Sequence, residues 1–158
     1  MHHVFEVVSP EEKRAVSREI LEALPEWFGI PEARENYIAG SAGQLFFCAR
    51  DCAPDGEKTL GFLCLQETGK ATVELTVMGV LKEFHRQGIG SALVKAAQEH
   101  AAQAGYSFMQ VKTVQMGRYP EYDATNRFYL QLGFKEFEVF PTLWDEWNPC
   151  QIYVMALK

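Results

Sequence analysis

Two glycines, Gly88 and Gly90, stand between an apolar stretch that ends at Leu81 and an alanine-rich stretch that runs to Ala104. The first stretch reads VELTVMGVL, which is typical of a strand, and the second reads SALVKAAQEHAAQA, which is typical of a helix. Glycines let the backbone approach a ligand closely, and the first turn of a helix offers N–H groups without intrahelical partners. The helix dipole adds partial positive charge there. The arrangement predicts a binding site for a phosphate-bearing ligand.

The spacing disfavours two common classes of phosphate-binding loop. A Walker loop requires Lys and then Ser or Thr directly after its last glycine, whereas Ser91 and Ala92 follow Gly90. A dinucleotide fingerprint requires a third glycine where this chain has Leu93. The segment is therefore not expected to bind a nucleoside triphosphate or a dinucleotide.

The six residues from His85 to Gly90 resemble the Arg/Gln-x-x-Gly-x-Gly/Ala loop of the GNAT superfamily, the acetyl-coenzyme A-dependent N-acetyltransferases. His85 stands where that family has Arg or Gln. The resemblance implies that backbone N–H groups of this loop bind a pyrophosphate, that Arg86 adds charge, and that the preceding strand pairs with the pantetheine arm. The residues expected to bind the cofactor are Met78, Val80, His85, Arg86, Gln87, Gly88, Ile89, Gly90, Ser91 and Asn126.

A second motif, TNRFYLQLGF, strengthens the resemblance, because GNAT members often carry a helix ending in Tyr, then three residues, Gly and an aromatic. Tyr129, Gly133 and Phe134 have that spacing. Tyr122 and Thr125 stand where the family often has Asn and Ala. The resemblance implies that Tyr129 is the acid that protonates the departing thiolate; a core tyrosine is the alternative interpretation.

Acetyl transfer to an amine also needs a base, because a lysine-like amine has a pKa of about 10.4. Glu74 is the candidate, since it shares a strand face with Thr76, Met78 and Val80. In the histone-acetylating branch of the family, the catalytic glutamate has the same offset from the loop. A solvent-exposed strand glutamate is the alternative. Backbone N–H groups near Met78 to Val80 are the expected oxyanion donors.

Six aromatic residues form the expected substrate pocket, and the first three lie in the region of the first two helices that covers the acceptor site in the family. They are Trp27, Phe28, Tyr37, Tyr119, Trp144 and Trp147. Asp145 and Glu146 lie between the last two, and aromatic faces next to acids suit a cationic amine. Packing in the core or a surface loop explains the same residues.

The bulk composition indicates an ordinary globular protein, because 47% of the 158 residues are hydrophobic and 23% are charged. We expect one domain over residues 1–158. The formal net charge of −6, without a basic cluster, disfavours nucleic acid. It would favour a cationic partner, although a role in solubility alone explains the same charge. No apolar run is long enough for a membrane span and no secretory signal is visible, so a cytoplasmic protein is expected. Four cysteines without CxxC spacing predict free thiols and no metal site.

The pattern of elements predicts an α/β fold: a mixed, mostly antiparallel central sheet of about seven strands with one parallel pair, flanked by about four helices. The resemblance to the GNAT family implies that the two parallel strands splay apart. The expected strands are 4–8, 44–50, 59–66, 71–81, 106–114, 134–140 and 151–157. The expected helices are 10–24, 32–38, a helix that follows the glycine turn and ends at Gly105, and 122–132, with a loop at 40–43.

The expected function is direct transfer of an acetyl group from acetyl-coenzyme A to a primary amine of a small molecule or peptide. Three alternatives remain open at this point. The chain could be a non-catalytic acyl-coenzyme A-binding sensor or partner module on the same fold. It could also transfer another acyl group, or act on a protein N-terminus. A homodimer is a further expectation from the family.

Overall fold

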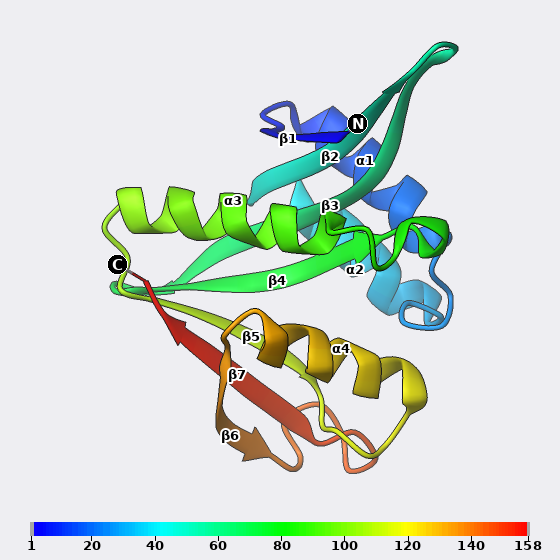
Figure 1. The fold of residues 1–158 in the computed structure, drawn as a ribbon. Coiled ribbons are helices and arrows are strands. Elements are labelled where there is room, and N and C mark those ends of the chain that lie inside the picture. Colours follow the sequence, from blue (N-terminus) through cyan, green and yellow to red (C-terminus); the bar gives the residue numbers. More distant parts are fainter. Residues whose placement is uncertain (1, 158) are drawn as a thin grey trace. The chain divides into compact units, whose positions relative to one another are not determined.

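The computed structural model describes residues 2–157, which form seven strands, four α-helices and one short 3-10 helix (Figure 1). The strands are β1 (His2–Glu6), β2 (Leu45–Ala53), β3 (Gly56–Gly69), β4 (Thr72–Val80), β5 (Phe108–Val114), β6 (Lys135–Phe140) and β7 (Cys150–Ala156). The helices are α1 (Pro10–Glu22), α2 (Pro31–Ser41), η1 (Lys82–Phe84), α3 (Ile89–Gln103) and α4 (Pro120–Gln131).

The strands form one sheet in the order β1-β2-β3-β4-β5-β7-β6. β1 with β2, β2 with β3, β5 with β7, and β6 with β7 pair antiparallel, whereas β4 and β5 are parallel. Within residues 2–157, the β4–β5 ladder runs only from Thr72–Phe108 to Leu75–Val111. The predicted fold class, including the single parallel pair, is confirmed.

The chain divides into two compact units. The first holds the chain up to Gln66 together with Thr76–His100, and the second holds Glu67–Leu75 together with the chain from Ala101 onward. β4 contributes to both units, because the boundary falls between Leu75 and Thr76. The expectation that residues 1–158 form one domain stays a prediction.

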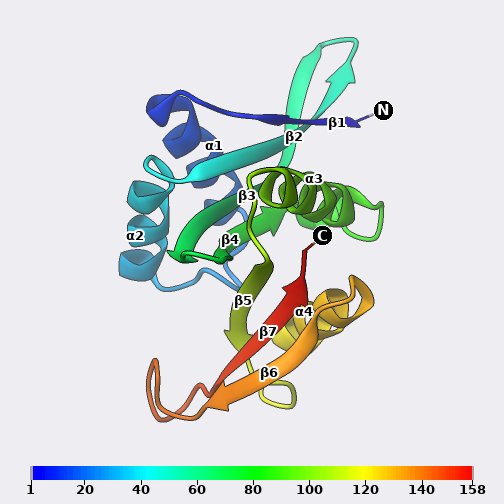
Figure 2. The ribbon, with the colours of Figure 1, turned by 90° about the vertical axis from the view of Figure 1, so that its left-hand side faces the viewer.

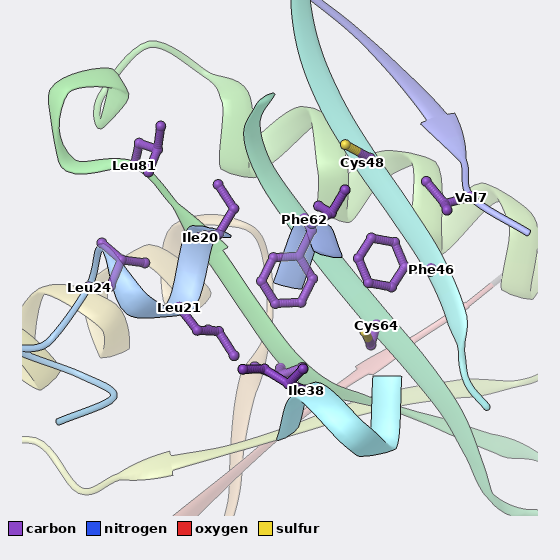
Figure 3. Packing of buried hydrophobic residues seen from close by; sticks show 12 residues of the cluster. Val7, Ile20, Leu21, Leu24, Ile38, Phe46, Cys48, Phe62, Cys64 and Leu81 are labelled. Carbon is purple, nitrogen blue, oxygen red and sulfur yellow. The ribbon is translucent and has the colours of Figure 1, made fainter. Parts of the chain in front are cut away.

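In the first unit, α1 and α2 lie on one face of the strands and α3 lies on the other (Figures 1 and 2). The hydrophobic cluster between the strands and the first two helices contains only apolar side chains and two cysteines (Figure 3). Its buried members are Val7, Val16, Ile20, Leu21, Leu24, Ile38, Phe46, Cys48, Phe62, Cys64, Val77 and Leu81. Gly79 of β4 lets α1 approach closely, since a Cβ atom there would lie 2.9 Å from side-chain atoms of Ile20 and Leu24.

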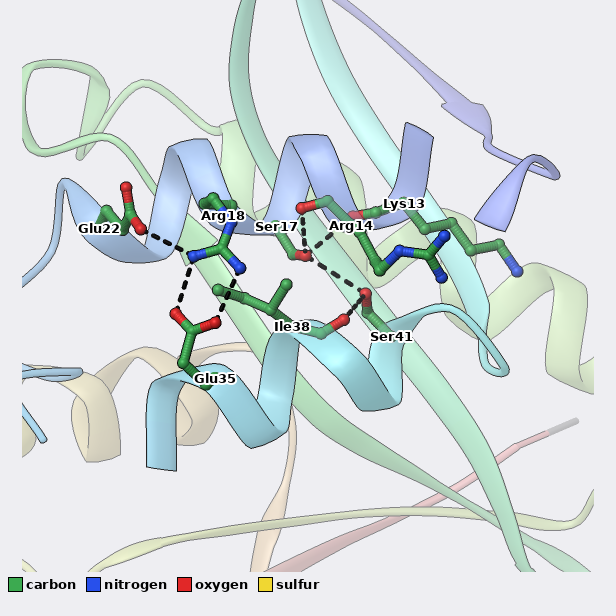
Figure 4. A network of polar contacts seen from close by, with 8 residues as sticks. All are labelled: Lys13, Arg14, Ser17, Arg18, Glu22, Glu35, Ile38 and Ser41. Atoms are coloured by element: carbon green, nitrogen blue, oxygen red, sulfur yellow. Dashed lines mark hydrogen bonds and ion pairs between the residues drawn. The ribbon is translucent and has the colours of Figure 1, made fainter. Parts of the chain in front are cut away.

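Polar contacts join α1 to α2 (Figure 4). The buried hydroxyls of Ser17 and Ser41 lie 3.2 Å apart, and Ser41 also donates to the Ile38 carbonyl at 2.7 Å. On the surface, both terminal nitrogens of Arg18 donate to Glu35 at 2.8 Å. The hydrogen bonds from Arg18 hold the pKa of Glu35 below its ordinary value. These contacts fix the pairing of the two helices.

Several predicted element ends are wrong, and at two of them a residue that often ends a helix is accommodated within one. The expected loop at 40–43 begins too early, since α2 continues to Ser41, whose hydroxyl binds the preceding turn. The fourth helix begins at Pro120 rather than residue 122, because proline fits the first turn, where no intrahelical N–H bond is lost. β3 also extends beyond 59–66, to Gly56–Gly69, because it pairs with β2 as far as Gly56.

Candidate functional site

The start of α3 presents unpaired backbone donors. The first intrahelical bond runs from the Ala92 N–H to the Gly88 carbonyl at 3.0 Å, so the N–H groups of Ile89, Gly90 and Ser91 precede it. Gly88 has φ +80° and Arg86 has φ +64°, and both residues are exposed. Two left-handed residues in quick succession turn the chain sharply into the helix. This arrangement fits an anion at the helix start.

The last residues of β4 have a backbone edge that faces away from β3. The Leu81 N–H donates to the carbonyl of Leu60 in β3 at 2.9 Å, and the carbonyl of Gly79 lies toward Gly61, which also belongs to β3. Because backbone groups alternate along a strand, those of Met78 and Val80 point to the opposite edge. Ladder pairing with β5 ends at Leu75, before either residue. This edge fits the amide groups of an extended ligand.

His85 contacts the end of the same strand. Its Nε2 lies 2.6 Å from the Val80 carbonyl, which can only accept, so the ring donates a hydrogen bond from Nε2. The Trp27 ring meets the imidazole edge-on, with centroids 5.9 Å apart. Nearby, Lys82 of η1 pairs with Glu26 at 2.5 Å. The segment after α1 and the segment after β4 are therefore joined by two contacts.

The candidate base, Glu74, lies on the strand face that was predicted, because the burial of β4 alternates and Glu74, Thr76, Met78 and Val80 are all half-buried. Its carboxylate accepts a hydrogen bond from Lys112 of β5 at 3.0 Å. Lys112 was not predicted as a partner of Glu74. The parallel pairing of β4 with β5 was predicted, but identifying Lys112 also requires the register of the two strands, which places Glu74 opposite Gln110.

The candidate acid, Tyr129, lies on α4 and is 5% exposed. Its ring packs against Phe128, Phe134 and Tyr153, with centroids 5.5 to 6.2 Å apart. The second motif therefore places Tyr129 and Phe134 in contact, as in the alternative interpretation of Tyr129 as a core tyrosine, and its role as the acid stays a prediction.

Asn126, one turn earlier on α4, is fully buried. Its amide nitrogen donates to the carbonyls of Val114 and Tyr122 at 2.8 and 2.7 Å, and its oxygen accepts from the Tyr153 hydroxyl at 2.5 Å. These contacts tie α4 to β5 and β7. Because contacts within the fold account for both amide donors, we do not assign Asn126 to cofactor binding.

The expected pocket aromatics fall into separate groups. Trp27 and Phe28 are half-buried against the hydrophobic cluster that lies between the strands and helices α1 and α2. Phe28 meets Tyr37 edge-on, with ring centroids 5.8 Å apart. Tyr119 packs against Tyr122 at 6.1 Å. Trp144 and Trp147 are 45% and 70% exposed in the β6–β7 loop. That loop is organised by Asp145, which accepts from the Asn148 side-chain amide and from the backbone of Trp147 and Asn148. The bond from the Asn148 side chain, with those from the backbone, holds the pKa of Asp145 below its ordinary value.

All four cysteines carry free thiols; Cys48, Cys64 and Cys150 are buried and Cys52 is exposed. Within residues 2–157, no group of three His, Cys, Asp or Glu side chains is arranged to hold a metal ion. None of the helices in this described range has the length and apolar character needed to cross a membrane.

The residues at 78–91 fit coenzyme A as a ligand: a strand edge beyond the β4–β5 ladder, an open helix start and an exposed Arg86 complement its amides and its anionic diphosphate. The structure resembles a GNAT-family protein from Desulfovibrio desulfuricans, with a TM-score of 0.81, 18% identity and full coverage of both chains. It also resembles the ribosomal-protein-S18-alanine N-acetyltransferase of Escherichia coli, with a TM-score of 0.75, 16% identity and coverage of 100% and 95%.

A third similar structure is the Salmonella typhimurium protein yncA, solved with its cofactor acetyl-CoA. The TM-score is 0.70 at 14% identity, with coverage of 99% and 94%. A search of curated protein sequences finds no match. The model of the acetyltransferase (GNAT) domain matches residues 42–136, more than half of the sequence. The chain therefore belongs to the GNAT acetyltransferase family.

Proposed function

We propose that the protein transfers an acetyl group from acetyl-coenzyme A directly to a primary amine of a small molecule or peptide. The observation that carries the proposal is the start of α3, which lies inside the segment matched by the GNAT model. There, the N–H groups of Ile89, Gly90 and Ser91 precede the first helical hydrogen bond.

The chain would hold the cofactor through backbone groups. The edge of Met78 and Val80 pairs with the amides of the pantetheine arm, as an added strand would. The N–H groups at residues 89–91 and the Arg86 guanidinium balance the charge of the diphosphate. When bound, acetyl-coenzyme A supplies an activated thioester.

Two side chains would move protons. Glu74 accepts a proton from the ammonium form of the acceptor, directly or through a water, because only a neutral amine is nucleophilic. Tyr129 gives its phenolic proton to the departing sulfur and recovers one from solvent. A backbone N–H of Met78 or Val80 donates to the carbonyl oxygen as charge develops on it.

A cationic acceptor suits this chain, because its formal net charge of −6 attracts an amine during encounter. The aromatic side chains of Trp27 and Phe28, which are half-buried, offer apolar and ring-face contacts to such a substrate. We place the acceptor against this group rather than the two exposed tryptophans.

Two glycine variants test the cofactor site. Gly88 and Gly105 both have positive φ, +80° and +95°, and a Cβ atom at either would meet nothing within 4 Å. Alanine at either position therefore carries similar backbone strain, about 1–2 kcal/mol. Acetyl-coenzyme A should raise the melting temperature of wild type and Gly105→Ala, whereas Gly88→Ala should bind at least about tenfold more weakly, a loss of about 1.4 kcal/mol.

Turnover is measured on the same preparations with a panel of amines and several acyl-coenzymes. Acetyl transfer to any amine supports the enzyme. Stabilisation by acetyl-coenzyme A without turnover of any amine, peptide or protein N-terminus would favour the non-catalytic binder. Equal binding by the two glycine variants would contradict the placement of the diphosphate at α3.

A further inference from the structure

Lys112 of β5 holds the carboxylate of Glu74 on β4. The Lys112 Nζ lies 3.0 Å from Glu74 Oε1, and both residues belong to the second unit. The β4–β5 ladder ends at the pair Leu75–Val111. Lys112 is the next residue after that last pair, so its side chain reaches back across the ladder to Glu74.

The pair is partly withdrawn from water, because the Glu74 side chain is 13% exposed and the Lys112 side chain 29%. Solvent screens such a pair less than one on the surface. A half-buried carboxylate also needs a partner to compensate its charge. A carboxylate has two oxygens and about four lone-pair sites, so a bond to Oε1 leaves capacity to accept a proton.

Cys150 of β7 is a further titratable group near the pair, since the charges of Lys112 and Glu74 both act on its thiol. Burial raises the pKa of Cys150 to about 11, so the thiol stays protonated at neutral pH. It therefore adds no charge beside the pair. Gln110, which lies opposite Glu74 in the ladder, is uncharged.

We propose that Lys112 is a positioning residue for the proton-transfer step, holding the Glu74 carboxylate in the orientation that accepts the proton of the substrate ammonium. This inference rests on the proposed function. The proton leaves the ammonium nitrogen and joins a Glu74 oxygen, while Lys112 keeps its own protons throughout. Lys112 touches neither substrate nor cofactor and acts only through Glu74.

The test is a double-mutant cycle with steady-state kinetics on the best amine of the panel. Because a general base contributes about 10²- to 10⁴-fold, Lys112→Met should lower kcat by about tenfold or more and leave the acceptor KM within about threefold. Lys112→Arg, which keeps the cation, should recover most of kcat. In the Glu74→Gln background, Lys112→Met should cause no further loss, since the group it positions is already gone.

Lys135→Met is the matched control, because it makes the same substitution at an exposed lysine of β6 in the same unit and should leave kcat unchanged. Melting temperatures identify any variant that fails to fold, in which case Lys112→Gln replaces Lys112→Met in the cycle. A full additional loss in the Glu74→Gln background, or an unchanged kcat in folded Lys112→Met, would overturn the role of Lys112 alone. Wild type without turnover of any amine would overturn the proposed function as well.

Discussion

At the scale of single residues, Tyr129 is the proposed acid that protonates the departing thiolate. Its ring packs against three aromatic neighbours, so the ring contributes to the core whether or not the hydroxyl takes part in the reaction. The structural and catalytic interpretations of this tyrosine therefore make different predictions for loss of the hydroxyl alone.

Tyr129→Phe keeps the ring and removes the acid, so kcat should fall by about 10²-fold or more with little change in melting temperature. Tyr106→Phe is the control, because that hydroxyl binds Glu67 at 2.5 Å in the same unit and has no assigned role in the reaction. Unchanged turnover of a good amine by Tyr129→Phe would remove Tyr129 from the mechanism.

The cysteines give a prediction about pH. Burial raises the pKa of Cys64 to about 12 and of Cys48 to about 11, as it does for Cys150, whereas Cys52 is exposed. At pH 8, Ellman's reagent should label one thiol of the native protein rapidly and four thiols after denaturation. A Cys52→Ser variant should lose the rapid phase. Rapid labelling of several native thiols would contradict the buried positions.

The same thiols couple stability to pH. Unfolded cysteine thiols titrate at about 8.5, so between that pH and about 11 the folded state retains protons that the unfolded chain has lost. The stabilisation is therefore complete below about pH 8.5 and declines as the pH rises above it. Chemical denaturation at pH 8 and pH 10 measures this change, and replacing Cys64 with Ala should reduce the dependence on pH.

At the scale of elements, β4 connects the packing of the first unit with the proposed site. One face of its last residues lies on α1 through Val77 and Gly79, and its free backbone edge belongs to Met78 and Val80. The position of that edge depends on how closely β3 and β4 approach.

Gly61 of β3 permits that approach, because a Cβ atom there would lie 2.7 Å from the Gly79 carbonyl oxygen and 3.2 Å from the Val80 Cα. Gly61→Ala should lower the free energy of unfolding by about 1–3 kcal/mol, since backbone rather than a flexible side chain must move. It should also weaken acetyl-coenzyme A binding by shifting the Met78–Val80 edge.

Gly43→Ala is the control for this variant, because a Cβ atom there would meet nothing within 4 Å. It should change the free energy of unfolding by less than about 0.5 kcal/mol. Chemical denaturation measures the stability of both variants, and a Gly61→Ala protein as stable as Gly43→Ala would show that β3 and β4 tolerate a wider spacing.

The elements could be predicted from the sequence where a local pattern fixes them. The alternation of VELTVMGV gave the buried face of β4, and Gly88 and Gly90 located the turn into α3. Element ends were less predictable, because Pro120 can begin a helix as well as interrupt one. Contacts across long sequence separations could not be predicted, because Lys112 reaches Glu74 and Asn126 binds Tyr153 only in a particular strand register.

At the scale of the whole molecule, a negative net charge and aromatic side chains near the start of the chain favour a cationic amine as the acceptor. If charge steers the acceptor, kcat/KM for a cationic amine should fall as salt rises from 50 to 500 mM, and that for a neutral acceptor should not. Steady-state assays at several salt concentrations measure this difference.

In the proposed cofactor site, backbone N–H groups of Met78, Val80 and residues 89–91 bind acetyl-coenzyme A. Hydrogen–deuterium exchange with and without acetyl-coenzyme A tests it most directly, because it reports on these amides whatever the acceptor is. We predict slower exchange across residues 76–92 of wild type on binding, and less slowing in Gly88→Ala at the same subsaturating ligand concentration. If acetyl-coenzyme A binds but exchange in residues 76–92 is unchanged, or is slowed only elsewhere, the placement of the cofactor at these residues is contradicted.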